Sequence, residues 1–114
     1  MNKPTFNPAI KEVIDSFLSA FPGVVPGKMF GFPAYYVNKK LCVCIYDDGV
    51  GLKVSEEKAN EIIGSPGIIP FQPYGKAKMK EWIQINREKP EDYLKDKEIF
   101  DVSVRYVASL PEKR

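Results

Sequence analysis

The amino-acid sequence predicts an α+β fold: a single two-layer domain over residues 1–114, with an antiparallel sheet and the element order α-β-β-β-α-β-β-α. Three observations predict this class. Apolar residues recur at helical spacing near both ends of the chain, and β-rich segments separated by turn signals lie between them. A chain of 114 residues buries about two thirds of the surface that it exposes when unfolded, which is enough for one hydrophobic core.

The first helix is predicted over residues 7–21. Asn7 is a good N-cap, and Pro8 suits the first helical position, where its missing N–H costs no hydrogen bond. Pro22 and Gly23 then end the helix. Its apolar stripe must pack against another element and consists of Ile10, Val13, Ile14, Phe17, Leu18 and Phe21.

Residues 28–54 predict three antiparallel strands, because the turn signals Asn38-Lys39 and Asp48-Gly49 divide this β-rich stretch. Two-residue loops at both turns would set the pairing of the strands. The expected partners are Val37 with Lys40, Tyr36 with Leu41, Asp47 with Val50 and Ile45 with Leu52.

This register predicts two faces for the sheet. The expected core face contains Phe30, Phe32, Ala34, Tyr36, Leu41, Val43, Ile45, Val50, Leu52 and Val54. The expected outer face contains Met29, Gly31, Pro33, Tyr35, Val37, Cys42, Cys44, Tyr46, Gly51 and Lys53. A slip of one residue in either loop would exchange the faces of the strand involved, so the assignment depends on the loop lengths.

A short helix and two strands are expected next. Ser55 is a suitable N-cap for a helix through Ile63, which Gly64 ends. Residues 68–71 form a short strand, and the proline within it favours a position at a sheet edge. A further strand opens at Met79 and places Trp82 on the side opposite to the isoleucines that follow.

The C-terminal residues fit both a strand and a helix. Val102, Val104 and Tyr106 alternate as in a strand, but a stripe of about a dozen residues that stops at Pro111 favours a helix. A shorter helical turn is predicted to begin near Pro90.

The chain contains no histidine, which removes the usual general base and the commonest metal ligand. Cys42 and Cys44 provide only half of the usual ligand set for structural zinc, and a disulfide between them would strain an extended strand. We therefore expect free thiols, no metal, no cofactor and no catalytic residue. The longest apolar run, residues 41–46, is far shorter than the roughly 20 residues of a membrane-spanning helix, so we expect a cytoplasmic protein without a membrane partner.

Basic and aromatic residues interleave in two segments, although the formal net charge of the chain is only +2. Residues 22–46 contain three lysines and no acidic residue, and residues 73–89 contain five basic and two acidic residues. Such surfaces contact phosphates while aromatic rings stack on bases, but small domains also need lysines for solubility. The candidate binding residues are Lys28, Tyr35, Lys39, Lys40, Tyr46, Lys53, Lys76, Lys78, Lys80 and Trp82.

An ordered set of short motifs resembles the N-terminal domain of the TfoX (Sxy) family from about Val24 onward. The motifs are Lys28-Met29-Phe30-Gly31, Val37-Asn38-Lys39-Lys40, Val50-Gly51-Leu52-Lys53-Val54, Pro70-Phe71 with Tyr74, Met79 with Trp82, and Ala108-Ser109-Leu110-Pro111. The resemblance implies a two-layer α+β domain with one antiparallel sheet, standing alone without the family's C-terminal helical domain. Full-length TfoX proteins regulate natural competence and DNA uptake in bacteria together with the cyclic-AMP receptor protein, and the family supplies no catalytic residues.

Two functions follow as hypotheses. The first is a small non-catalytic regulatory or interaction module, linked through the resemblance to competence and DNA transformation, which binds protein or nucleic acid through its lysine-rich loops or forms a homodimer through its outer sheet face. The alternative is a small-ligand binder or an enzyme with a pocket between helix and sheet. Its lining would include Tyr35, Tyr46, Lys53 and the two cysteines.

Overall fold

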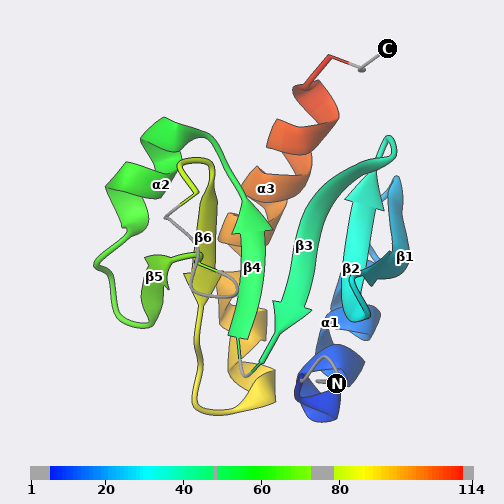
Figure 1. The fold of residues 1–114 in the computed structure, drawn as a ribbon. Helices are drawn as coiled ribbons and strands as arrows, with labels where there is room; N and C mark the ends of the chain where they lie inside the picture. The colour runs from blue at the N-terminus through cyan, green and yellow to red at the C-terminus, as the bar shows by residue number, and fades with distance from the viewer. Residues whose placement is uncertain (1–5, 48, 73–78, 112–114) are drawn as a thin grey trace.

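The computed structural model describes residues 6–47, 49–72 and 79–111, and these residues adopt the predicted α+β fold (Figure 1). A six-stranded antiparallel sheet has the strand order β1-β2-β3-β4-β6-β5. The strands are β1 (Val24–Met29), β2 (Phe32–Val37), β3 (Lys40–Tyr46), β4 (Gly49–Lys53), β5 (Ile68–Pro70) and β6 (Trp82–Ile85). The helices are α1 (Pro8–Leu18), α2 (Glu56–Ile62), the 3-10 helix η2 (Pro90–Asp96) and α3 (Lys97–Ser109).

The helix predictions are confirmed, with one shorter boundary. The side chain of Asn7 accepts a hydrogen bond from the N–H of Ala9 at 2.9 Å, and Ser55 accepts one from the N–H of Lys58 at 3.1 Å. Both are the N-caps that the sequence predicts. The first helix ends at Leu18 rather than at residue 21, and the ambiguous C-terminal segment is helical.

The prediction of three strands before α2 is wrong, because there are four. Phe30 and Gly31 have φ angles of 51° and 87° and form a two-residue turn, so that Met29 pairs with Phe32. Strand β1 therefore lies beside β2 as the outermost strand on this side of the sheet. Phenylalanine is an unusual residue for such a turn, which is why the sequence did not indicate it.

Two of the four predicted strand pairs are confirmed. Val37 pairs with Lys40 and Tyr36 with Leu41 across the predicted two-residue turn. In the next hairpin Ile45 pairs with Val50 and Tyr46 with Gly49, so its loop lies one residue earlier than predicted. The two predicted partners of this hairpin, Asp47 with Val50 and Ile45 with Leu52, are therefore wrong.

A β-bulge at the start of β3 changes which residues share a face. Tyr36 pairs with Leu41 but Tyr35 pairs with Val43, which leaves Cys42 as the extra residue. Cys42 and Val43 both join the core beneath the helices, whereas Cys44 belongs to a cluster on the opposite face. The prediction that the two cysteines lie on one side of the strand is therefore wrong.

The core lies between the sheet and the helices (Figure 1). The predicted core positions of β3 and β4 are confirmed for Val43, Ile45, Val50, Leu52 and Val54. In β2 the faces are exchanged, because Tyr35 and Val37 belong to this core and Ala34 and Tyr36 to the outer cluster. The helices contribute Ile10, Ile14, Leu18, Ala59, Tyr93, Phe100, Val104 and Val107.

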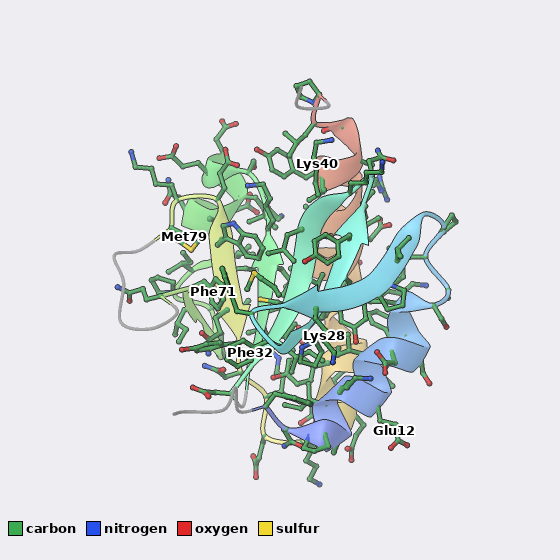
Figure 2. The ribbon with its side chains drawn as sticks, turned by 45° about the vertical axis from the view of Figure 1, so that its right-hand side comes forward. Glu12, Lys28, Phe32, Lys40, Phe71 and Met79 are labelled. Carbon is green, nitrogen blue, oxygen red and sulfur yellow. The ribbon has the colours of Figure 1, made fainter. Side chains whose placement is uncertain are left out.

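The outer face of the sheet has a second, smaller cluster. Its buried members are Ala34, Cys44, Phe71 and Trp82, with Met29, Tyr36, Leu41 and Tyr46 packed against them. The Phe71 ring lies 5.5 Å from the Trp82 ring and 5.8 Å from the Tyr46 ring, and Figure 2 shows Phe71 on this face together with Phe32. A Cβ atom at Gly51 would lie 3.1 Å from the Phe71 ring, so glycine allows the ring to approach the sheet.

Candidate functional site

A groove of about 970 Å³ lies where the β2–β3 turn, the start of β3, the end of β4, the start of β6 and the C-terminal end of α3 meet. Three of its lining residues are lysines and one is acidic. The full lining is Asn38, Lys39, Lys40, Leu41, Lys53, Glu81, Trp82, Leu110 and Pro111. The structure thus brings together four of the candidate binding residues, Lys39, Lys40, Lys53 and Trp82, from three separate segments of the chain.

The β2–β3 turn places two of the lysines. Asn38 and Lys39 have φ angles of 51° and 67°, as a type I′ turn requires, and Val37 pairs with Lys40 immediately beside it. Lys39 is exposed and Lys40 is half-buried. In Figure 2, Lys40 projects at the end of the sheet where α3 also ends.

The third lysine is held over the floor of the groove. The Nζ atom of Lys53 lies 3.0 Å from Oε1 of Glu81 and 5.7 Å from the centre of the Trp82 ring. Pairing of Lys53 with Trp82 across β4 and β6 places both side chains on the same face of the sheet. Lys53 is therefore fixed by an ion pair and a cation–π contact.

Glu81 is the acidic member of the groove, and two side chains favour its ionised form. The hydrogen bond from Lys53 is the main cause that lowers the pKa of Glu81, and a hydrogen bond from Tyr106 contributes as well. Burial, followed by the hydrogen bond to this carboxylate, raises the pKa of Tyr106. Tyr106 thus connects α3 to the start of β6.

The groove has a surplus of positive charge. Glu81 is paired with Lys53, whereas neither Lys39 nor Lys40 forms an ion pair with an acidic residue in the described ranges 6–47, 49–72 and 79–111. Three lysines against one glutamate leave two charges uncompensated. The arrangement can hold negatively charged groups, with ammonium donors on one rim and apolar side chains on the floor.

The remaining candidate residues do not join the groove. Lys28 is exposed on β1 and pairs with Pro33, at the opposite end of β2 from the partner of Lys40 (Figure 2). The Tyr46 ring packs at a tilt against the Phe32 ring, with the ring centres 4.9 Å apart. Lys80 is exposed just before β6, and Lys76 and Lys78 lie outside the described residues.

Tyr35 was predicted on the outer face and instead lies in the core, 2% exposed. Its hydroxyl donates a hydrogen bond to Asp15 of α1. Burial, followed by this hydrogen bond, raises the pKa of Tyr35 well above its ordinary value. Tyr35 is thus a structural link between α1 and β2.

Trp82 lies at the groove, but its ring is only 6% exposed. The sequence left open whether α3 covers this side chain. It lies on the face opposite to α3, where Phe71 covers it. Trp82 is therefore neither covered by α3 nor left open to solvent, because Phe71 packs against it from the outer face.

Both cysteines are free and fully buried. Burial raises the pKa of Cys42 to about 11 and that of Cys44 to about 12. Such thiols are poor nucleophiles at neutral pH, because the thiolate is the reactive form. Cys42 instead contacts the hydroxyl of Ser103, which also donates a hydrogen bond to the backbone oxygen of Lys53 at 2.6 Å.

Sequence reasoning missed half of the groove. Asn38 was assigned to a turn, Leu41 to the predicted core face, Glu81 to the strand that opens at Met79, and Leu110 and Pro111 to the end of a helix. The one signal in the sequence was Pro111, which ends the apolar C-terminal stripe and so marks where the helix ends. Only the three-dimensional structure places that helix end beside the β2–β3 turn.

No family model, no curated protein and no solved structure matches this chain. The described residues contain no cluster of three or more potential metal ligands. Within the same residues, no helix has the length and the apolar character needed to cross a membrane.

Proposed function

We propose that this chain is a small non-catalytic regulatory module that binds a negatively charged partner in the groove between the β2–β3 turn and the end of α3. The observation behind this proposal is the convergence of Lys39, Lys40 and Lys53 from two hairpins onto one hollow. Lys53 is distant in sequence from Lys39 and Lys40, but the fold brings all three side chains to one groove. Their combined positive charge attracts anionic ligands.

The resemblance to the TfoX N-terminal domain supplies the biological setting of the proposal. It supports a role in the regulation of competence and DNA transformation through contacts with protein or nucleic acid. The motifs Val37-Asn38-Lys39-Lys40 and Ala108-Ser109-Leu110-Pro111, on which the resemblance partly rests, contain five groove residues. The sequence feature and the structural feature therefore coincide.

Homodimerisation through the outer face of the sheet stays a separate prediction. Phe71 already lies on this face and buries Cys44 and Trp82 within one chain. The apolar area left for a second copy is correspondingly smaller, so the groove is the better supported interaction site.

Tryptophan fluorescence tests the proposal directly, because the chain has a single tryptophan and it lies at the groove. We expect polyglutamate and a DNA duplex to perturb the emission of Trp82 at low salt, with weaker binding as salt rises. The variant with both Lys39→Gln and Lys40→Gln should lose about ten-fold in affinity, at about 0.7 kcal/mol per lysine.

Lys28→Gln is the matched control, since it removes an exposed lysine at the other end of β2. Its affinity should stay within about two-fold of the wild type. The proposed function would be overturned if neither polyglutamate nor the DNA duplex bound, or if the control and the groove variant lost the same amount of affinity.

A further inference from the structure

The groove has two chemically distinct sides. Lys39, Lys40 and Lys53 form a cationic rim, and Leu41, Leu110 and Pro111 present apolar atoms beside it. Leu41 and Leu110 are only half-buried and Pro111 is exposed, so these apolar groups are accessible to a ligand. A purely electrostatic site for a polyanion would not need this apolar side.

The aromatic ring at the groove is not available for stacking with a nucleic-acid base. Trp82 is 6% exposed, with the Phe71 ring 5.5 Å away and the Lys53 ammonium 5.7 Å from its ring centre. Stacking on open aromatic faces supplies about 1–3 kcal/mol per base in proteins that bind single strands. The groove lacks that contribution.

A peptide matches both sides of the groove better. Carboxylates of an acidic segment would pair with Lys39 and Lys40, which have no acidic partner among the described residues. Apolar side chains of the same segment would contact Leu41 and Leu110. Backbone N–H groups of such a segment can donate hydrogen bonds to the Glu81 carboxylate, which already pairs with Lys53.

We infer that this groove docks an acidic amphipathic segment of a partner protein, with its carboxylates on the lysine rim and its apolar side chains against Leu41, Leu110 and Pro111. This inference rests on the proposed function and specifies its partner. The volume of about 970 Å³ suits a short segment rather than a folded domain. Recognition of an apolar helix face in a groove is an established mode of peptide binding.

Two synthetic peptides of equal length and charge test the inference. One has glutamates with leucines at helical spacing, and the other has serines in place of the leucines. We expect the leucine peptide to bind at least about five-fold more tightly, measured by the fluorescence of Trp82 and by anisotropy of a labelled peptide. A single-stranded and a double-stranded oligonucleotide are measured in parallel, and both should bind more weakly than the leucine peptide.

Variants separate the two sides of the site. Leu110→Ser should weaken binding of the leucine peptide about three- to five-fold and leave binding of the serine peptide unchanged. Lys39→Gln should weaken both peptides by a similar factor. The matched controls are Leu94→Ser, at a leucine that is 50% exposed in η2, and Lys28→Gln, and neither should change the affinity.

The outcomes distinguish this inference from the proposed function. If both peptides bind equally, the groove is a general anion site and the inference is wrong. The same conclusion follows if an oligonucleotide binds more tightly than the leucine peptide and Lys39→Gln weakens the binding of that oligonucleotide. If neither the peptides nor the oligonucleotides bind, the proposed function fails together with the inference.

Discussion

Phe30 is the most exposed large apolar residue of the described chain at 79%, and it has a φ angle of 51°. The left-handed conformation costs about 1–2 kcal/mol for a residue with a Cβ atom, and least for asparagine and glycine. The exposed ring recovers little of this cost through packing. Phe30 therefore strains the β1–β2 hairpin.

The first prediction concerns this strain. Phe30→Asn should raise the free energy of unfolding by about 1 kcal/mol, because Asn-Gly is the preferred sequence of a type I′ turn. Urea denaturation measures the change. Val25→Asn in the same hairpin is the control: this residue is 59% exposed in an extended strand, and its replacement should not stabilise the protein. A destabilised Phe30→Asn variant would refute the assignment of strain.

The second prediction concerns the thiols. Because burial raises the pKa of Cys42 to about 11 and of Cys44 to about 12, iodoacetamide at pH 8 should leave both unmodified in the folded protein. Mass spectrometry should detect both adducts after the same treatment in denaturant. Rapid alkylation of the native protein would show that one of the thiols is accessible.

At the scale of elements, α1 is connected to β2 through one ionised group. Asp15 accepts hydrogen bonds from Lys11, at 2.6 Å, and from Tyr35. Burial by itself would raise the pKa of Asp15, but these hydrogen bonds outweigh it and the pKa lies below the ordinary 3.8. A carboxyl group with a lowered pKa in the folded state stabilises the protein above its unfolded pKa, and this contribution disappears as the pH falls through the folded pKa.

The third prediction follows from the lowered pKa of Asp15, which stabilises the folded protein at neutral pH but not in acid. Asp15→Asn should destabilise the protein by about 1 kcal/mol near neutral pH, a value reduced by the partial exposure of the ion pair. The difference from the wild type should shrink below about pH 4. Denaturation at several pH values measures it. Glu12→Gln, at an exposed residue of the same helix, is the control and should leave the stability near neutral pH unchanged, and an undiminished effect of Asp15→Asn in acid would contradict the assignment.

The helices could be predicted from the sequence, whereas the irregularity of the sheet could not. Caps and apolar periods are local signals, so α1, α2, η2 and α3 were predictable from residues such as Asn7 and Ser55. The bulge at Cys42 has no residue signature, because it depends on how β2 and β3 fit together. That one residue decided which face Tyr35 and Ala34 occupy.

The same distinction applies to the groove. Lys39, Lys40, Lys53 and Trp82 stood out through charge and aromatic content within short segments. Glu81 and Leu110 became part of the groove only because α3 ends beside β6 and the β2–β3 turn. A contact between residues so distant in sequence has no local pattern that would reveal it.

At the scale of the whole molecule, both edges of the sheet contain a proline. Pro26 lies in β1 and Pro70 in β5, the two outermost strands. A proline has no N–H to donate to an incoming strand, and natural sheets use it to prevent pairing between edges. The sheet is therefore protected against growth from either side.

The fourth prediction tests this protection. Pro26→Val should increase concentration-dependent self-association at least about three-fold relative to the wild type, measured by sedimentation, since β1 would gain a backbone donor along an exposed edge. Val25→Thr, at an exposed neighbouring position, controls for changes in side-chain composition. Equal association of the proline variant and the wild type would show that other features block this edge.

The β2–β3 turn has a consequence for how this sequence is able to change. Lys39 has a φ angle of 67°, where glycine after Asn38 would give the most favourable turn, yet glycine would remove one of the cations beside the groove. If the groove binds the anionic partner proposed above, the stability of the turn and the affinity for that partner make opposing demands on residue 39. Under that proposal, Lys39→Gly would give a more stable turn and a weaker binding site.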